Sequence, residues 1–323
     1  MQKTLAVINL CRLRENAQKI RAVLGSRHFY AVVKADAYGH GAPEVARAIE
    51  DIVDGFCVAI IDEGAALRLS GITKPVIVFT PPLDEDDALR ARLYSLEVTV
   101  NGVRAAKLSE GLPCHIKVNT GMNRTGCNIA QLPEVLQSVA PENILSVYSH
   151  LYNPASERDS LVQLKLFDRA EKIVKDIAPQ AFAHIAASGG LLAGERYLKE
   201  GARCGILLYG YTPAGFNFPV EPIMKVYARR VQTTPFIGGG AGYARAKKNY
   251  KFLHTYRLGY ADGFARNIPL GENMLCMDAF VSEKGAELLP VLEDAERYAA
   301  RAGTISYEAL CAATRRAERV YEE

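Results

Sequence analysis

Polar side chains that could do chemistry stand at the ends of short apolar runs in this sequence. Lys34 ends the run that begins at Phe29, and the loop after it carries Tyr38, Gly39 and Gly41. A lysine amine that is partly shielded from water can act as a nucleophile or a base. Later strand-like runs carry similar groups near their ends: Lys117 and Arg124 lie at the end of the fifth run and in its loop, and His150 ends the sixth. His184 and Ser188 lie at the end of the seventh run, and Arg203 begins the eighth.

The runs that carry these residues predict a parallel barrel. Eight strand-like runs alternate with helix-like patterns over the first two thirds of the chain, which is typical of an α/β fold. The strand-like runs are 29–35, 56–61, 75–80, 96–100, 115–119, 144–150, 181–187 and 204–210. The helix-like patterns between them are 43–53, 62–71, 84–95, 102–110, 131–140 and 156–178. Eight units in near-regular succession favour a (β/α)8 TIM-like barrel over an open doubly wound sheet, and place the chemistry at the carboxyl ends of the strands.

A second, smaller and mostly β domain is predicted after the barrel. Four prolines punctuate residues 213–235, and residues 224–234 and 249–260 alternate like antiparallel strands with one wet face. We expect a barrel domain over 11–212, and a C-terminal domain made of 1–10 and 213–323. The glycine-rich stretch 238–243 lacks the strand and helix context of a nucleotide loop and predicts a hairpin turn.

Composition excludes several classes of function. The chain has 323 residues and a net charge of +3 without a basic stripe, so nucleic acid is not an expected partner. Seven scattered cysteines include no CxxC pair, which argues against a disulfide framework or a zinc site and fits the cytoplasm. No apolar run reaches membrane length, and no metal site is expected.

Each polar residue taken singly has a structural explanation, but together they carry a family resemblance. A lone lysine at a strand end usually reaches past apolar surface to water, and a lone strand histidine usually makes a core hydrogen bond. In combination, the segments resemble the alanine racemases, pyridoxal-phosphate enzymes of fold type III. The matching segments run in order from the lysine motif: AVVKADAYGHG, KVNTGMNR, SHLYNP, HIAASGG, RCGILLYG, GYADGFAR, LCMDA and TISY.

The resemblance implies an amino-acid racemase with two opposed bases. Moving a proton off Cα and returning one to the opposite face needs an electron sink, which pyridoxal 5'-phosphate supplies. The family implies that Lys34 holds the cofactor and acts on one face, while Tyr260 acts on the other. A phenol with an ordinary pKa near 10 is a poor base at neutral pH, so nearby cations must stabilise the phenolate. His150 and Arg124 are the candidates.

The same resemblance implies the remaining roles. Arg203 would face the pyridine nitrogen, and because a guanidinium cannot accept a proton it would keep that nitrogen unprotonated. Lys117 corresponds to a lysine that is often carbamylated, which would make it an anion able to order Arg124. Arg124 and Met277 would contact the substrate. The cofactor phosphate would be surrounded by Tyr38, Ser188, Gly205, Ile206 and Tyr307.

The implied assembly is a homodimer with composite active sites, in which Tyr260 and Met277 reach the partner's site. The expected role is D-alanine biosynthesis for the cell wall. The sequence departs from the family at Asn119, where many relatives have Asp, at Asn123, where they have Gly, and at Ala187, where many have Asn. The segments between GYADGFAR and LCMDA and between LCMDA and TISY are shorter than usual, so the second domain is expected to have lost a hairpin or more.

Four functional hypotheses stay open at this point. The first is an alanine racemase, and a serine racemase of the same architecture is its near alternative. The second is a non-catalytic pyridoxal-phosphate-binding barrel. The third is a decarboxylase or aldolase of the same fold type, and the fourth is a phosphate-binding barrel without the cofactor. Tyr260 and the second domain favour the racemase.

Overall fold

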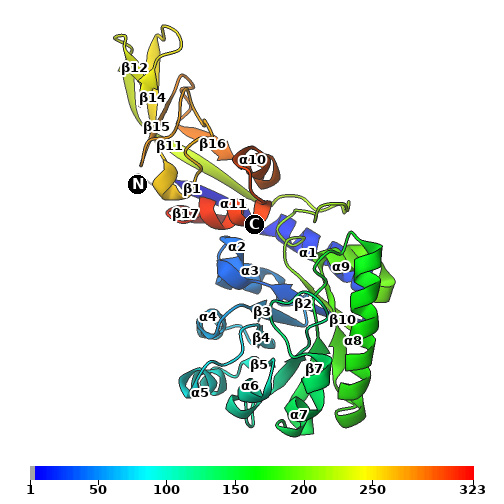
Figure 1. Cartoon of the computed structure of the whole chain (residues 1–323). Helices are drawn as coiled ribbons and strands as arrows, with labels where there is room; N and C mark the ends of the chain where they lie inside the picture. The colour runs from blue at the N-terminus through cyan, green and yellow to red at the C-terminus, as the bar shows by residue number, and fades with distance from the viewer. Residues whose placement is uncertain (1–3) are drawn as a thin grey trace. The chain divides into compact units, whose positions relative to one another are not determined.

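The computed structural model describes residues 4–323, which form two compact units (Figure 1). The barrel unit comprises residues 13–35 and 42–220, and the C-terminal unit comprises residues 4–12, 36–41 and 221–323. The loop 36–41 after Lys34 therefore packs with the C-terminal unit although the chain on either side of it belongs to the barrel unit. The domain boundaries expected from the sequence stay a prediction, because compactness does not establish independent folding.

The barrel unit is built on a parallel sheet with the strand order β8-β7-β6-β5-β4-β3-β2-β10-β9. Its strands are β2 (His28–Val32), β3 (Gly55–Val58), β4 (Val76–Val78), β5 (Glu97–Val100), β6 (Cys114–Lys117), β7 (Ile144–Tyr148), β8 (Phe182–His184), β9 (Ala186–Ala187) and β10 (Gly201–Cys204). Only Ile185 separates β8 from β9. Because β8 pairs with β7 and β9 pairs with β10, this interrupted strand closes the sheet into an eight-membered ring. The predicted TIM-like barrel is confirmed.

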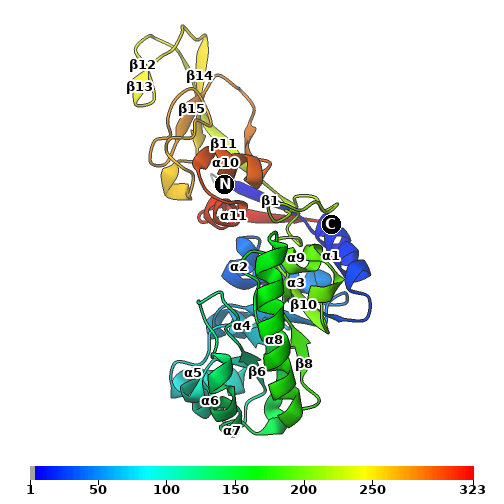
Figure 2. The same cartoon turned by 45° about the vertical axis from the view of Figure 1, so that its right-hand side comes forward.

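The strands of the ring are short apolar runs that are buried on both faces. Every residue of β3, β4, β6 and β10 is buried, as expected for parallel strands covered by helices outside and by side chains inside. The helices lie around the ring, and α8 packs against β7 (Figures 1 and 2). They are α1 (Leu10–Leu24), α3 (Ala42–Ile49), α4 (Ile61–Leu69), α5 (Glu85–Leu93), α6 (Val103–Leu108), α7 (Leu132–Gln137), α8 (Glu157–Ile177) and α9 (Ser188–Ala193).

The last strand of the ring lies earlier in the chain than the apolar run 204–210 predicted. Strand β10 ends at Cys204, and the following residues form tight turns in which Leu208 N–H donates to Gly205 O (2.8 Å) and Tyr209 N–H donates to Ile206 O (3.1 Å). Arg203 is thus the third residue of β10 rather than its first. The run 205–210 is apolar because it is buried, and apolar character alone does not distinguish a buried turn from a buried strand.

The C-terminal unit is a mixed sheet around one long strand. Strand β11 (Met224–Pro235) pairs antiparallel with β1 (Leu5–Asn9), β14 (Phe252–Arg257) and β16 (Leu288–Leu292). The sheet also holds β15 (Phe280–Ser282) and β17 (Glu318–Glu322), the latter parallel to β1. Helices α10 (Ala295–Ala302) and α11 (Ser306–Ala313) pack on each other. The structure confirms the prediction that the second domain is mostly β.

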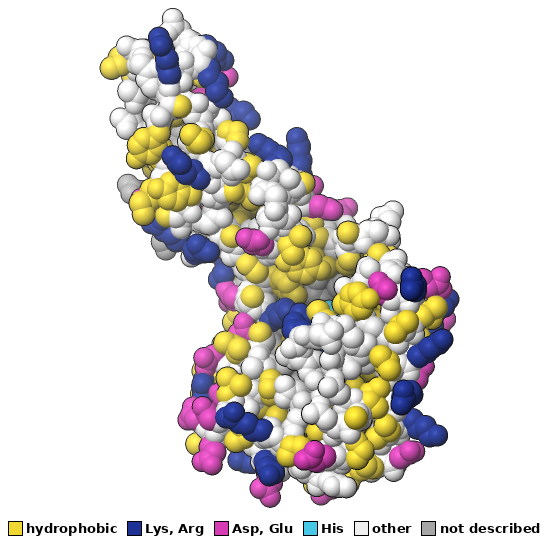
Figure 3. All heavy atoms as spheres, viewed as in Figure 1, with side chains coloured by type: hydrophobic (Ala, Val, Ile, Leu, Met, Phe, Trp, Pro, Cys, Tyr) yellow, Lys and Arg dark blue, Asp and Glu magenta, His cyan; other side chains and the backbone are white. Residues whose placement is uncertain are grey.

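The glycine-rich stretch in this unit forms the expected hairpin. Strands β12 (Gly240–Ala241) and β13 (Ala244–Arg245) pair antiparallel, and Gly242 between them has φ +70°. On the face shown in Figure 3, Lys and Arg side chains of the barrel unit are interspersed with Asp and Glu, as the charge balance suggested. Within residues 4–323, no helix has the length and apolar character needed to cross a membrane.

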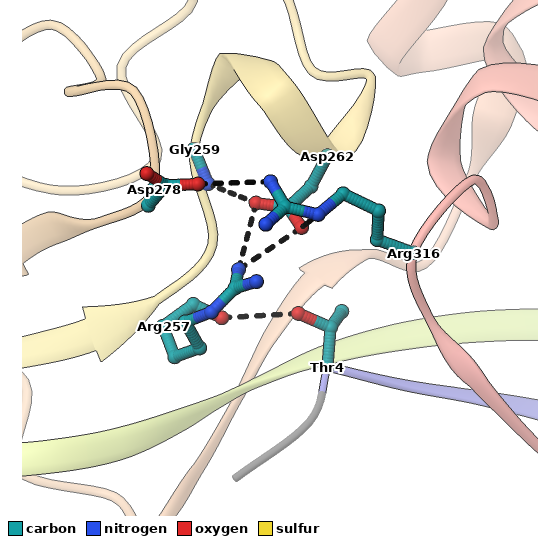
Figure 4. Close-up of polar contacts among 6 residues, drawn as sticks. All are labelled: Thr4, Arg257, Gly259, Asp262, Asp278 and Arg316. Atoms are coloured by element: carbon teal, nitrogen blue, oxygen red, sulfur yellow. Dashed lines mark hydrogen bonds and ion pairs between the residues drawn. The ribbon is translucent and has the colours of Figure 1, made fainter.

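A buried carboxylate fixes the turn that carries Tyr260. Asp262, which is 2% exposed, accepts two hydrogen bonds of 3.0 Å from Arg257 and one of 2.8 Å from the Gly259 amide. Arg316 approaches the same carboxylate at 3.6 Å and binds Asp278 at 2.8 Å (Figure 4). The carbonyl of Arg257 accepts from the Thr4 hydroxyl at 3.0 Å. Asp262 therefore ties the turn to β14 and to the chain after α11.

We predict that Asp262→Ala lowers the free energy of unfolding by about 3 kcal/mol, because it leaves the Arg257 guanidinium and the Gly259 amide without their buried acceptor. Asp278→Ala is the matched control. Asp278 is half exposed and binds the same Arg316, so its loss is expected to cost less than about 1 kcal/mol. Denaturation of both variants followed by circular dichroism gives the comparison, since the chain has no Trp. Equal losses would contradict the anchoring role of Asp262.

Candidate functional site

Lys34 opens a left-handed turn at the carboxyl end of β2. It begins α2 (Lys34–Tyr38), and Ala35, Asp36, Ala37 and Tyr38 all have φ of +53° or +54°. Left-handed backbone costs roughly 1–2 kcal/mol for each residue with a Cβ, and four in succession need strong support from their surroundings. Such strain is characteristic of functional positions.

Each part of this turn is held by contacts within its own unit. In the barrel unit, the Ala35 amide donates to Glu63 Oε1 at 2.7 Å, and Glu63 Oε2 accepts from the Ala59 amide. In the C-terminal unit, Asp36 forms an ion pair of 2.6 Å with Arg319, whose Nε donates to the carbonyl of Gly39. The turn that follows Lys34 is therefore fixed along its whole length.

His40 and Gly39 complete the loop. Burial lowers the pKa of His40 to about 4, so its imidazole is neutral, and its Nδ1 donates to the carbonyl of Ala37 at 2.8 Å. Gly39 has φ +85°, and a Cβ there would lie 2.3 Å from Thr314 Oγ1. The glycine and histidine of the lysine motif are thus required by the backbone, which is a structural reason for a pattern first noticed as chemistry.

A cluster of cations lies inside the barrel near the strand ends. Lys117 Nζ is 4.2 Å and Arg203 Cζ is 5.0 Å from the centre of the Tyr148 ring. Both side chains are buried, and the contact of the Arg203 guanidinium with the aromatic ring offsets part of the cost of its burial. Burial, followed by the fields of Arg203, Arg124 and Lys34, lowers the pKa of Lys117 well below its usual value. Within residues 4–323 no carboxylate forms an ion pair with Lys117.

His150 experiences the same positive field. Burial, then Arg203, Lys117, Arg124 and Lys34, lower its pKa well below the usual value. The imidazole is therefore neutral at pH 7. Of the two groups expected to stabilise a phenolate, His150 can therefore act there only as a hydrogen-bonding group.

The two asparagines that depart from the family pattern organise the loop that carries Arg124. Asn119 Oδ1 accepts from the amides of Gly121 (3.1 Å) and Asn123 (3.0 Å), which an aspartate oxygen would do equally well. Asn123 has φ +56°, a conformation that glycine adopts freely and asparagine tolerates. Both departures therefore preserve the backbone of the loop, in which Arg124 is exposed.

Donors suited to a phosphate group lie together in each unit. In the barrel unit, the Gly205 amide donates to Ser188 Oγ at 3.1 Å, and Gly205 and Ile206 lie in the turn outside the sheet ladder. In the C-terminal unit, the rings of Tyr38 and Tyr307 are 5.8 Å apart, and burial raises the pKa of Tyr307, so it remains a phenol that can donate. Oxygen-rich anions are commonly bound by such hydroxyl and amide donors.

Tyr260 and Met277 are adjacent and exposed in the C-terminal unit. The amide of Tyr260 donates to the carbonyl of Cys276 (3.2 Å), and that of Ala261 donates to the carbonyl of Met277 (3.0 Å). A Cβ on Gly259 would lie 2.2 Å from the Met277 carbonyl oxygen, so the close approach requires glycine. Tyr260 is 40% and Met277 is 55% exposed. The two expected bases thus belong to different units, Lys34 to the barrel unit and Tyr260 to the C-terminal unit.

Two residues that support the site were given no role from the sequence. Glu63 stands in the first turn of α4, where acidic residues are common, yet it holds the amide next to Lys34. Tyr209 lies in an apolar run, and its buried hydroxyl donates to the carbonyl of Val32 at 2.9 Å, which joins the end of β2 to the turn at Gly205. Among residues 4–323 no group of side chains could hold a metal ion.

Comparison with known proteins supplies the family. Residues 8–213 match the model of the alanine racemase N-terminal domain. An alanine racemase of Citrifermentans bemidjiense is 32% identical over 375 aligned positions, with 98% of each chain covered. Because 375 positions exceed the 323 residues here, the alignment contains gaps in this chain, consistent with its shortened segments.

Solved structures agree with this match. The alanine racemase of Clostridium difficile superposes with a TM-score of 0.87 at 26% identity, covering 99% of this chain and 96% of that one. The alanine racemase of Bartonella henselae, which carries covalently bound pyridoxal phosphate, has the same fold with a TM-score of 0.81 at 23% identity, and both chains are covered fully. The chain belongs to the alanine racemase family of isomerases.

Proposed function

We propose that this protein interconverts L- and D-alanine with pyridoxal 5'-phosphate as cofactor, and that Lys34 and Tyr260 are the two opposed bases. The observation that carries the proposal is the place of Lys34, which follows a barrel strand, opens a strained and fully supported turn, and lies within the field that acts on Lys117 and His150. The relatives are alanine racemases, so the serine racemase and the non-catalytic binder are not favoured.

The residues of the chain fit the cofactor. Hydroxyls of Ser188, Tyr38 and Tyr307 and the amides at Gly205 and Ile206 are suitable donors for its phosphate. Arg203 would donate to its ring nitrogen, and because a guanidinium does not give up its proton it would keep that nitrogen unprotonated. When bound, the cofactor supplies the electron sink that makes the substrate Cα–H acidic. Lys34 then moves the proton on one face of Cα and Tyr260 on the other.

Substrate binding is assigned to Arg124 and Met277. Arg124 is exposed on a loop whose shape Asn119 fixes, and its guanidinium suits the carboxylate of an amino acid. Met277 is held beside the Tyr260 turn and limits the size of the side chain that fits. We place the protein in the cytoplasm, which the seven free cysteines support, with D-alanine biosynthesis for the cell wall as its role.

We also propose that Lys117 is carbamylated. Its lowered pKa makes the amine a neutral nucleophile at physiological pH. Attack of Nζ on carbon dioxide forms an N–C bond and releases one proton, and the product is an anion in a place where Arg203, Arg124 and Lys34 provide positive charge. The carbamate would pair with Arg124 and order it for the substrate.

The cofactor is expected to be attached to Lys34. Reduction of the purified protein with borohydride should fix the cofactor on one peptide, the one that contains Lys34. Lys34→Ala should lose the absorbance band of lysine-bound cofactor, whereas Lys107→Ala, on the outer helix α6, should keep it. Attachment at another lysine, or a protein that never takes up the cofactor, would refute the proposal.

Mixing two inactive variants tests both the second base and the dimer. Tyr260→Phe should lower racemisation by roughly 10²–10⁴-fold, the usual contribution of a general base. Lys34→Ala should be inactive as well. If a C2 dimer builds each site from Lys34 of one subunit and Tyr260 of the other, a mixed dimer has one intact site. Random mixing should then restore about a quarter of the wild-type rate.

The control for this experiment uses a tyrosine outside the site. Tyr243→Phe, on the β12–β13 hairpin, should keep full activity. Absence of restored activity in the mixture, although mass spectrometry detects mixed dimers, would show that Lys34 and Tyr260 of one site come from the same chain. Full activity of Tyr260→Phe alone would remove the tyrosine from the reaction.

Carbamylation of Lys117 is expected to be visible by ¹³C NMR. Protein equilibrated with ¹³C-bicarbonate should show one carbamate resonance, which Lys117→Met removes and Lys107→Met retains. Because carbon dioxide adds only to the neutral amine, the resonance should weaken as pH falls. A resonance that survives Lys117→Met, or none at any pH, would contradict the assignment.

A further inference from the structure

A line of hydrogen bonds crosses the interior of the barrel from Arg203 to Glu97. Arg203 Nη1 lies 2.7 Å from His184 Nδ1, and His184 Nε2 lies 2.9 Å from Ser146 Oγ. Ser146 Oγ is 2.6 Å from His115 Nδ1, and His115 Nε2 is 3.0 Å from Glu97 Oε2. These five residues come from β10, β8, β7, β6 and β5. The interior of such barrels is normally filled by branched apolar side chains, so a polar line of this length needs an explanation.

The permanent charge of Arg203 sets the position of every proton in the line. A guanidinium only donates, so His184 Nδ1 must accept and the His184 proton must lie on Nε2. His184 Nε2–H then donates to Ser146, the Ser146 hydroxyl donates to His115 Nδ1, and His115 Nε2–H donates to the carboxylate of Glu97. Burial and the nearby Arg203 lower the pKa of His184 well below its usual value, which agrees with a neutral ring.

Arg203 has no direct counter-ion. It is 2% exposed, and its hydrogen bonds go to neutral acceptors, namely His184 Nδ1, the His184 carbonyl (3.0 Å), the Ser149 carbonyl (2.6 Å) and the Ile185 carbonyl (3.5 Å). Among the residues described, no carboxylate lies within ion-pairing distance of it. A buried charge without compensation is costly, and the line of hydrogen bonds leads from it to an acid.

Glu97 is positioned to compensate the charge of Arg203 from the far end of the line. It is the first residue of β5, at the amino end of the strand, whereas Arg203 acts near the opposite end of the barrel. Its side chain is 15% exposed, while His115, Ser146 and His184 are fully buried. Hydrogen bonds that all run in one direction polarise one another, so negative charge at one end strengthens acceptance at the other.

We propose that Glu97 is the remote counter-ion of Arg203 and a positioning residue for it, acting through His115, Ser146 and His184. The relay holds Nη1 of Arg203 on His184 and makes His184 Nδ1 a stronger acceptor. It thereby fixes the orientation of the guanidinium and reduces its strength as a donor toward any other group. The consequence for the ring nitrogen of the cofactor rests on the proposed function, whereas the relay itself rests on geometry.

The proton positions can be measured directly on the unaltered full chain. Six histidines are present, so ¹⁵N-histidine labelling gives few resonances, which single substitutions assign. We expect His184 and His115 each to carry a proton on Nε2 and none on Nδ1. A proton on Nδ1 of either ring, including a doubly protonated His115, would overturn the relay. Variants serve only to assign the resonances, and no bound cofactor is needed.

The charge at the far end is tested by Glu97→Gln, which keeps an acceptor oxygen and removes the negative charge. We expect the His184 Nδ1 resonance to move downfield, toward that of a nitrogen without a donor. Glu50→Gln is the matched control, because Glu50 accepts hydrogen bonds from Thr73 and Lys74 on the outside of the same unit. An equal response to both substitutions, or an unmoved His184 in Glu97→Gln, would refute a remote counter-ion.

Two further measurements test the middle of the hydrogen-bond line and its effect on the cofactor. Ser146→Ala should make His184 insensitive to Glu97→Gln, and continued sensitivity would show that the charge acts through space. With ¹⁵N-labelled pyridoxal phosphate bound, Glu97→Gln should move the ring-nitrogen resonance upfield, since Arg203 becomes a stronger donor. An unmoved ring nitrogen would remove Glu97 as a positioning residue for that group. Failure to bind the cofactor would instead refute the proposed function and leave the histidine measurements valid.

Discussion

Closure of the parallel sheet is the constraint on which the site depends. Strand β8 pairs with β7, the chain passes Ile185, and β9 pairs with β10, so one interrupted strand completes the ring. All strands of the ring are parallel, and their carboxyl ends therefore meet at one rim. Lys34, Lys117, Arg203 and the loop with Arg124 are brought together by this closure, although they are far apart in the sequence.

Bringing these cationic groups together is electrostatically unfavourable, and the structure reduces the repulsion in two ways. Burial, and then repulsion from the neighbouring cations, lower the pKa values of Lys117 and His150, which removes charge from the cluster. Arg203 cannot lose its proton and is instead embedded in neutral acceptors and an aromatic face. The result is a site with excess positive potential, suited to a phosphate and a carboxylate, in which the pKa of the Lys117 amine is lowered.

In the C-terminal unit, an exposed turn is supported by buried ion pairs. Its turn with Tyr260 is exposed, yet the residues behind it are tightly fixed, because Asp262 is buried between Arg257 and Arg316 (Figure 4). Tyr260 is thus an exposed phenol on a turn that buried contacts hold rigid. Here a buried ion pair provides precise placement rather than a large net gain in stability.

The sequence by itself determined the kind of fold and the residue types of the site. Apolar runs separated by amphipathic helices are enough to predict a barrel, and motifs around Lys34, Arg203 and Tyr260 are local enough to identify. Tertiary structure alone decided where the last strand ends, that Ala35–Tyr38 are left-handed, and that Glu63, Glu97 and Asp262 support the site. These features depend on electrostatic and hydrogen-bond partners that are distant in sequence, and a pattern of residue types contains no information about such pairings.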